Sequence, residues 1–193
     1  MTRAVVLLLV LQLVPHALKA QTRASPFETL DLGITVLADV NHGALQQWWS
    51  PGPAVGIGLT TPFYLGILEL GLQYAHPSAL SDDVPGFRSL FVYAGWGGGR
   101  ALGAGFAAAG TARVGIMAMR FEGDSLPGDR ASENELGVAA RAAVRWMPAG
   151  AWYAETSVSY QSILTSPHME QVLLAAGIGR RFATPAWLRD FLD

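Results

Sequence analysis

Apolar residues occupy every second position from Glu135 to Trp146. One parity holds Leu136, Val138, Ala140, Ala142, Val144 and Trp146, and the other holds Glu135, Gly137, Ala139, Arg141, Ala143 and Arg145. Because successive side chains of a β-strand point to opposite faces, this stretch predicts a strand with one apolar face and one small or charged face. Its 12 residues exceed the usual strand length and suffice for a tilted strand to cross a bilayer.

The same alternation recurs along the chain and predicts eight strands separated by turn-forming segments. The expected strands span residues 27–40, 53–60, 64–76, 89–96, 110–121, 135–146, 151–163 and 169–182. Three long polar connections, at 41–52, 77–88 and 122–134, alternate with three short turns. The short turns are at 61–63, at a segment that begins with 97–99, and at 148–150. The last connection, 164–168, is also short. Bacterial transmembrane barrels have an even strand count, short periplasmic turns and longer outer loops. The pattern therefore predicts an all-β chain, an eight-stranded antiparallel up-and-down transmembrane β-barrel.

The first twenty residues have the features of a signal peptide. Arg3 supplies a positive charge, the segment Ala4–Val14 is apolar, Pro15 interrupts it, and Ala20 is a small residue suited to cleavage. An N-terminal anchor helix is the alternative, but this apolar segment is shorter than the roughly 20 residues that span a bilayer. We therefore expect residues 1–20 to be a cleaved signal, residues 21–182 to form the barrel and residues 183–193 to form a periplasmic tail.

Composition agrees with an exported barrel and excludes some function classes. Charged residues make up 15% of the 193-residue chain, less than the roughly 25% of a typical soluble domain. There is no cysteine, so neither disulfides nor thiol chemistry enter. The formal net charge of −2 offers no basic patch for nucleic acid.

Aromatic residues gather near the expected strand ends. On the side of the short turns lie Phe27, Phe63, Tyr64, Trp96, Trp146, Trp152 and Phe182. Near the opposite ends lie Trp48, Trp49, Tyr74, Phe87, Phe121 and Tyr160. Amphipathic rings favour the headgroup level of a bilayer, so the distribution predicts two aromatic girdles.

The signal-like N-terminus, the eight alternating strands, the asymmetry of the connections and a last strand ending in Phe182 resemble the small outer-membrane barrels of the OmpA-transmembrane, OmpX and OmpW type. The resemblance covers roughly Phe27 to Phe182. It implies location in the outer membrane of a Gram-negative envelope, contact with outer-membrane lipid and folding by the barrel-assembly machinery. In that family the terminal aromatic residue usually closes the chain, whereas eleven residues follow Phe182 here.

The segment after Phe182 has the features of a short helix. Thr184 is a suitable N-cap, and Pro185 suits the first helical position. Trp187, Leu188, Phe191 and Leu192 would share one face of such a helix. The segment is either a disordered or packed tail, or an interfacial helix on the inner leaflet.

Charged residues on the inward parity predict a polar network in the lumen. The expected members are Asp31, Glu69, Arg141, Arg145 and Glu155, with Asp39 on the same parity. An eight-stranded barrel is only wide enough for side chains to fill, and desolvated charges must pair. A turn centred between residues 148 and 149 would place Arg141 opposite Thr156 and Arg145 opposite Trp152, and Glu155 would then bridge both arginines. We expect this network to plug the barrel.

Two further sets of residues raise the question of chemistry. His42, His76 and His168 fall at the outer ends of strands, but no local metal-ligand spacing accompanies them. Some eight-stranded barrels are lipid A acylases or deacylases that use His and Ser with a carboxylate. His76-Pro77-Ser78 is the nearest such arrangement, without the surrounding pattern of those enzymes. We therefore expect no metal, no cofactor and no catalytic residue.

These observations favour a non-enzymatic outer-membrane barrel with a structural, surface-interaction or small-solute role and an unknown outer partner. One alternative is a soluble periplasmic barrel that binds an apolar ligand, as lipocalins do. Such a barrel needs its apolar parity inside, and the girdle aromatics argue against it. The second alternative is a lipid A-modifying enzyme of the outer membrane.

Overall fold

The computed structural model describes residues 26–40, 45–81, 84–122, 132–148, 150–165 and 169–192. The predicted signal peptide, residues 1–20, lies outside this part of the chain. The barrel strands are β1 (Thr29–Asp39), β3 (Ala54–Phe63), β4 (Gly66–Ala75), β6 (Phe87–Gly103), β7 (Phe106–Phe121), β8 (Ser132–Trp146), β9 (Trp152–Ile163) and β10 (Met169–Ala183).

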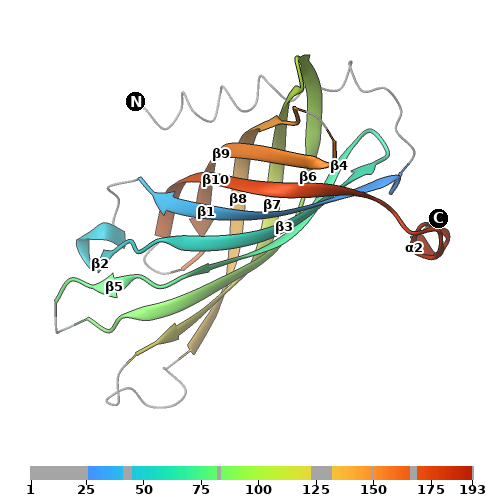
Figure 1. Cartoon of the computed structure of the whole chain (residues 1–193). Coiled ribbons are helices and arrows are strands. Elements are labelled where there is room, and N and C mark those ends of the chain that lie inside the picture. The colour runs from blue at the N-terminus through green and yellow to red at the C-terminus, as the bar shows by residue number, and fades with distance from the viewer. Residues whose placement is uncertain are drawn as a thin grey trace.

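These strands form one closed barrel in the order β1-β10-β9-β8-β7-β6-β4-β3 (Figure 1). Strands that follow one another along the barrel wall pair antiparallel, and β1 closes the sheet by pairing with both β10 and β3. The expected eight-stranded antiparallel up-and-down barrel is confirmed. Closure leaves no unpaired sheet edge, which is the requirement for strands in a bilayer.

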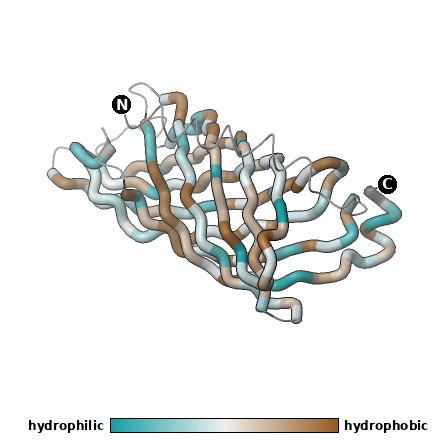
Figure 2. Tube along the Cα trace, turned by 90° about the horizontal axis from the view of Figure 1, so that it is seen from above, coloured by the Kyte–Doolittle hydropathy of each residue, from teal (hydrophilic) through white to brown (hydrophobic). Residues whose placement is uncertain are grey.

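The apolar parity of the strands faces outward. Ile34 on β1, Val138 on β8 and Ile178 on β10 are 58%, 40% and 63% exposed. Figure 2 shows apolar segments recurring on strands around the barrel. Neighbouring inward residues such as Asp31 and Arg141 are buried. The exterior is therefore the apolar surface that hydrocarbon requires, and the interior is polar.

The two ends of the barrel differ. At the short-turn end, β3 joins β4, β6 joins β7 and β8 joins β9. At the long-loop end, the connections include the 3-10 helix η1 (Leu45–Gln47) and two short strands, β2 (Trp49–Ser50) and β5 (Ser78–Ala79), which pair with each other. The sequence pattern predicted only polar loops here. Figure 1 shows β2 and β5 at the end of the barrel opposite the C-terminus.

The chain after β10 forms α2 (Ala186–Leu192) at the short-turn end. The amide of Thr184 donates to the carbonyl of Glu28 at 3.1 Å, which ties the start of this segment to the chain preceding β1. Trp187 on the helix is 71% exposed. Within the described ranges, no helix is long and apolar enough to cross a membrane.

The glycine run Gly97–Gly99 does not begin a turn, contrary to the sequence prediction. These residues continue β6, which pairs with β7 as far as Gly103, and the turn lies at Ala104 and Gly105. Ala104 has a φ of 51° and Gly105 a φ of 78°, the left-handed conformation of a tight turn. The turn after β3 is likewise at Tyr64 and Leu65, beyond the predicted segment 61–63.

The predicted register of β8 against β9 is also wrong. Arg145 pairs with Glu155, not with Trp152, and Arg141 pairs with Ser159, not with Thr156. The connection runs from the end of β8 at Trp146 to Trp152, with Gly150 at a φ of 76°. This longer connection shifts the pairing by three residues and places Arg145 directly opposite Glu155, on the same face of the sheet.

Candidate functional site: a chain of ion pairs in the lumen

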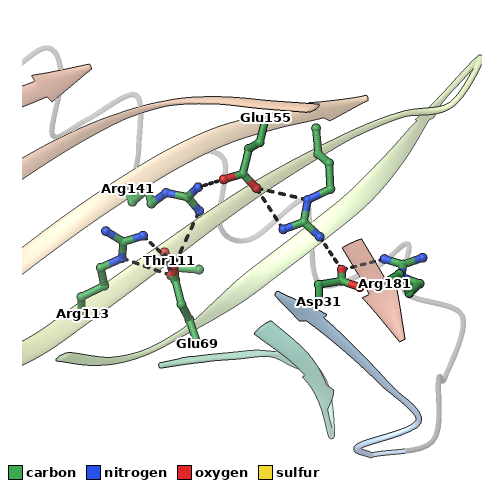
Figure 3. A network of polar contacts seen from close by, with 8 residues as sticks. Asp31, Glu69, Thr111, Arg113, Arg141, Glu155 and Arg181 are labelled. Carbon is green, nitrogen blue, oxygen red and sulfur yellow. Dashed lines mark hydrogen bonds and ion pairs between the residues drawn. The ribbon is translucent and has the colours of Figure 1, made fainter. Parts of the chain in front are cut away.

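Charged side chains from six strands meet inside the barrel (Figure 3). Seven residues alternate in sign, and we call them the ion-pair chain: Arg113, Glu69, Arg141, Glu155, Arg145, Asp31 and Arg181. Asp31 lies on β1, Glu69 on β4, Arg113 on β7, Arg141 and Arg145 on β8, Glu155 on β9 and Arg181 on β10. Each occupies the inward parity of its strand.

The first part of the chain centres on Glu69. Nη2 of Arg113 lies 2.6 Å from one carboxylate oxygen of Glu69, and Nε of Arg113 donates to the other at 3.1 Å. The hydroxyl of Thr111 donates to the same carboxylate at 3.0 Å, and Arg141 lies 3.8 Å away. The bidentate geometry is the strong form of an arginine–carboxylate pair. The side chains of Arg113 and Glu69 are each 4% exposed, so this pair is shielded from water.

The second part of the chain centres on Glu155 and Asp31. Glu155 accepts a hydrogen bond from Arg141 through one oxygen and bonds of 2.9 and 3.1 Å from Arg145 through the other. Arg145 also donates to Asp31. Asp31 in turn accepts bonds of 2.7 and 2.9 Å from Arg181. Every carboxylate of the chain therefore lies between two guanidinium groups, which offsets the desolvation of both charges.

Two tyrosines each cover one arginine of the ion-pair chain. The guanidinium carbon of Arg113 lies 4.4 Å from the ring centroid of Tyr93, and that of Arg145 lies 4.0 Å from the ring of Tyr153. A guanidinium this close to a ring face is attracted by the ring quadrupole. The Tyr153 ring rests against Gly179, where a Cβ would lie 2.2 Å from ring atoms. The glycine therefore makes room for the ring.

An apolar cluster occupies the lumen toward the long-loop end. Its members are Phe87, Phe91, Tyr93, Met117, Met119 and Ile163. Phe91 is 1% exposed, and its ring stacks on Tyr93 with centroids 5.3 Å apart. Trp49 of β2 packs edge-on against Phe87 at 5.3 Å and donates from its indole nitrogen to the carbonyl of Pro85 at 2.8 Å. Tyr93 belongs to this cluster and also contacts the ion-pair chain.

Cavities in the lumen are unequal in size. At the short-turn end, a cavity of about 270 Å³, the basal cavity, is lined by residues that include Thr29, Thr111, Arg141, Arg145 and Arg181. A cavity of about 40 Å³ lies between Tyr93 and Tyr153, and another of about 40 Å³ lies beside Phe91 and Gln161. The open space is therefore concentrated at one end of the barrel.

The structure brings together five of the six charged residues that the sequence pattern placed on the inward parity. The sixth, Asp39, is not a member of the ion-pair chain and accepts a hydrogen bond of 2.7 Å from Gln46. The structure adds Arg113, Arg181 and Thr111, which sequence reasoning missed. Arg181 could have been found from its parity, since it alternates with the outward residues Arg180 and Phe182. Arg113 was harder to find because β7 carries apolar residues on both faces, with Met117 buried and Ile116 exposed.

Comparison with solved structures places this architecture. The chain resembles Neisserial surface protein A at a TM-score of 0.61, with 11% identity, covering 82% of this chain and 100% of that one. It resembles the N-terminal β-barrel domain of Pseudomonas aeruginosa OprF at a TM-score of 0.54, with 13% identity over 82% and 100%. The chain has the fold of the small outer-membrane β-barrels. No family model matches the sequence, and no curated protein sequence matches it.

In an outer-membrane barrel, aromatic residues are expected where the wall meets the headgroups. Five of the seven residues of the predicted short-turn girdle are clearly exposed: Tyr64, Trp96, Trp146, Trp152 and Phe182. Phe63 is half-buried and packs edge-on against Tyr64, with ring centroids 4.6 Å apart. Phe27 departs from the prediction because it is 8% exposed and packs against Phe63 at 5.4 Å. Its φ of 57° turns the chain inward just before β1.

The predicted histidines do not form a common site in the part of the chain described. His42 and His168 lie outside the described residues. His76 lies 3.2 Å from Glu122, which also accepts a bond of 3.0 Å from Arg88. Desolvation opposes the shift, but hydrogen bonds from Arg88 and His76 outweigh it and lower the pKa of Glu122. Among the described residues, no group of three His, Asp or Glu is placed to hold a metal ion.

Proposed function

We propose that this protein is an integral outer-membrane barrel with a lumen closed to through-passage of solutes. The observation that carries the proposal is the arrangement of two barriers in series inside the barrel. The ion-pair chain crosses the lumen from β7 to β10, and the apolar cluster lies beyond it toward the long-loop end. A solute would have to separate paired, desolvated charges and then pass closely packed aromatic and methionine side chains.

The exterior supports the membrane location. Outward residues such as Leu32, Val55 and Ile116 are 45%, 49% and 56% exposed. Exposed apolar side chains around a closed wall suit hydrocarbon and are the reverse of a soluble ligand-binding barrel. Outer-membrane lipid is therefore the surrounding partner, and the barrel-assembly machinery would insert the chain.

The long-loop end supports a structural or surface-interaction role. The β2–β5 pair and the Trp49 contacts hold two long connections together over the apolar cluster. Trp48 and Leu80 project from this layer and are 52% and 57% exposed. The backbone bond from Leu80 to Trp48, 2.9 Å long, holds the two residues in neighbouring positions. An ordered surface with exposed apolar residues is suited to contact with another molecule outside the cell.

Fractionation and conductance together test the proposal. We expect the expressed protein in the outer-membrane fraction, extractable with detergent, with different gel mobility before and after boiling. The purified barrel in planar bilayers should give no steady ionic conductance, with a wide porin as positive control. Recovery in the soluble periplasm without heat-modifiable mobility would contradict the location. Steady conductance would contradict the closed lumen and leave the location standing.

A further inference from the structure

The basal cavity has an uneven charge balance. Its lining includes two acids, Asp31 and Glu155, and four arginines, which are Arg100 and the ion-pair-chain members Arg141, Arg145 and Arg181. The ion-pair chain as a whole contains four arginines and three carboxylates, because its alternation begins and ends with arginine. One positive charge is therefore left without a carboxylate of its own within the chain. A low-dielectric interior makes such a surplus costly unless an anion or water compensates it.

The surplus charge has an accessible end. Arg113, at one end of the ion-pair chain, is buried and donates to Glu69 through two guanidinium nitrogens. Arg181, at the other end, has a side chain that is 41% exposed, and it lines the basal cavity. Its Nε and Nη2 donate to Asp31. Nη1 is the one guanidinium nitrogen not used in these bonds. A donor is thus presented to a cavity that carries net positive charge.

The cavity has room for a ligand because many of its other lining residues are small, although Ile67 and Met147 also line it. Gly99, Ala107, Ala109 and Ala143 line it beside Thr60, Thr61 and Thr111. Its volume of about 270 Å³ is many times the roughly 10–15 Å³ that one water needs. The space equally suits one small organic anion. The hydroxyl of Thr111 already donates to Glu69, so the donors available to an anion are the guanidinium groups.

We propose that the basal cavity binds one small soluble oxyanion, of the phosphate or carboxylate class, beside Arg181 and Arg145. The site is a cup open at the short-turn end and floored by the ion-pair chain. This proposal rests on the proposed closed lumen, because the cavity is a binding site and not part of a channel only if the ion-pair chain closes its inner end. It gives the small-solute role of the barrel a chemical class.

Neighbouring arginines on opposite faces of β10 provide a matched test. Arg181 points into the cavity, whereas Arg180 points outward and its guanidinium carbon lies 5.6 Å from the ring of Trp152. Inorganic phosphate, and separately acetate, is titrated into the purified barrel in a phosphate-free maltoside detergent, with binding measured by calorimetry. We expect Arg181→Gln to weaken binding about tenfold or more, the loss of one charge-assisted hydrogen bond. Arg180→Gln should bind like the wild type.

A second variant removes space and keeps charge. Ala109→Leu fills part of the cavity and should weaken binding without altering any charged residue, while gel mobility before boiling shows that each variant is folded. Absence of binding by the wild type at millimolar anion, or equal losses in Arg181→Gln and Arg180→Gln, would overturn the proposal. A short-chain phosphatidylglycerol serves as a third titrant, and binding of this lipid alone would overturn the assignment to a soluble anion. Conductance does not enter this measurement, so failure here is distinct from failure of the closed-lumen proposal.

Discussion

Glu155 occupies the middle of the ion-pair chain, between Arg141 and Arg145. Its side chain is 9% exposed, so the carboxylate and both guanidinium groups are largely removed from water. Replacing Glu155 by leucine leaves Arg141 with Glu69 at 3.8 Å and Arg145 with Asp31. Two carboxylates must then compensate four arginines, so we expect the free energy of unfolding, measured with urea in lipid vesicles, to fall by about 3–5 kcal/mol.

A double-mutant cycle isolates the Glu155–Arg141 interaction. Replacing both residues by leucine removes one charge of each sign and should cost much less than the sum of the single replacements. The remaining residues still pair as Arg113 with Glu69 and as Asp31 with Arg145 and Arg181. Additive costs would show that the two side chains do not depend on each other, and would contradict this account of the lumen.

Gly179 is a second residue whose replacement is constrained by close neighbours. A Cβ there would lie 2.2 Å from atoms of the Tyr153 side chain, which is held over Arg145, and 2.6 Å from the carbonyl oxygen of Leu32. Gly179→Ala should therefore lower the free energy of unfolding by about 1–3 kcal/mol, the usual cost of overpacking. Gly58→Ala is the control, since the nearest atom there is 3.8 Å away. Equal effects at both positions would show that the close contacts at Gly179 do not determine the cost of the added methyl group.

At the scale of the element, the alternation of residue types predicted strands well where one face is strictly apolar. β8 ends at Trp146 as expected, because Val138, Val144 and their neighbours alternate with small or charged residues. Alternation did not predict the strand segments Gly97–Gly99 and Ala101–Ala108, because small residues occupy both faces there. The backbone hydrogen bonds between β6 and β7 maintain the hairpin there, and these do not depend on side-chain type.

Pairing between elements was harder to predict than the elements themselves. The register of β8 and β9 depends on the length and conformation of their connection, and an error in either moves every pair. Parity nevertheless predicted that Arg141, Arg145 and Glu155 share a face, because the side-chain period of a strand is two. Arg113 escaped notice because its strand is apolar on both faces, and only the structure shows that Met117 packs in the lumen.

The outward face of β8 gives a depth-dependent prediction. Val138 lies well inside the strand, whereas Val144 is one outward position from the exposed Trp146. Val138→Arg should lower the free energy of unfolding in lipid by about 2–4 kcal/mol, and Val144→Arg should cost less because arginine reaches the interface. Urea unfolding in vesicles measures the free energy of unfolding of both variants, and Leu80→Arg, in an exposed loop, is the control. A neutral Val138→Arg would invert the assignment of faces.

At the scale of the whole molecule, the lumen consists of three layers along the barrel axis. The basal cavity comes first, the ion-pair chain forms its floor, and the apolar cluster lies beyond that floor. Tyr93 joins the second and third layers, because its ring contacts both Arg113 and Phe91. The layers obstruct the lumen by different means. The charged layer resists separation of its ion pairs, whereas the apolar layer excludes hydrated ions.

Because the two barriers lie in series, we expect ions to pass only when both barriers are weakened in the same variant. Phe91→Ala removes the most buried ring of the apolar cluster but leaves the ion-pair chain intact. Arg141→Ala removes the guanidinium that links Glu69 to Glu155. Glu69 still pairs with Arg113 and Glu155 with Arg145, so the barrel should still fold. In planar bilayers we expect each single variant to remain as silent as the wild type and the double variant to conduct. Trp152→Ala paired with Arg141→Ala is the control, because it removes an aromatic residue from the outer face. Conductance by either single variant equal to that of the double would mean that one layer alone closes the lumen.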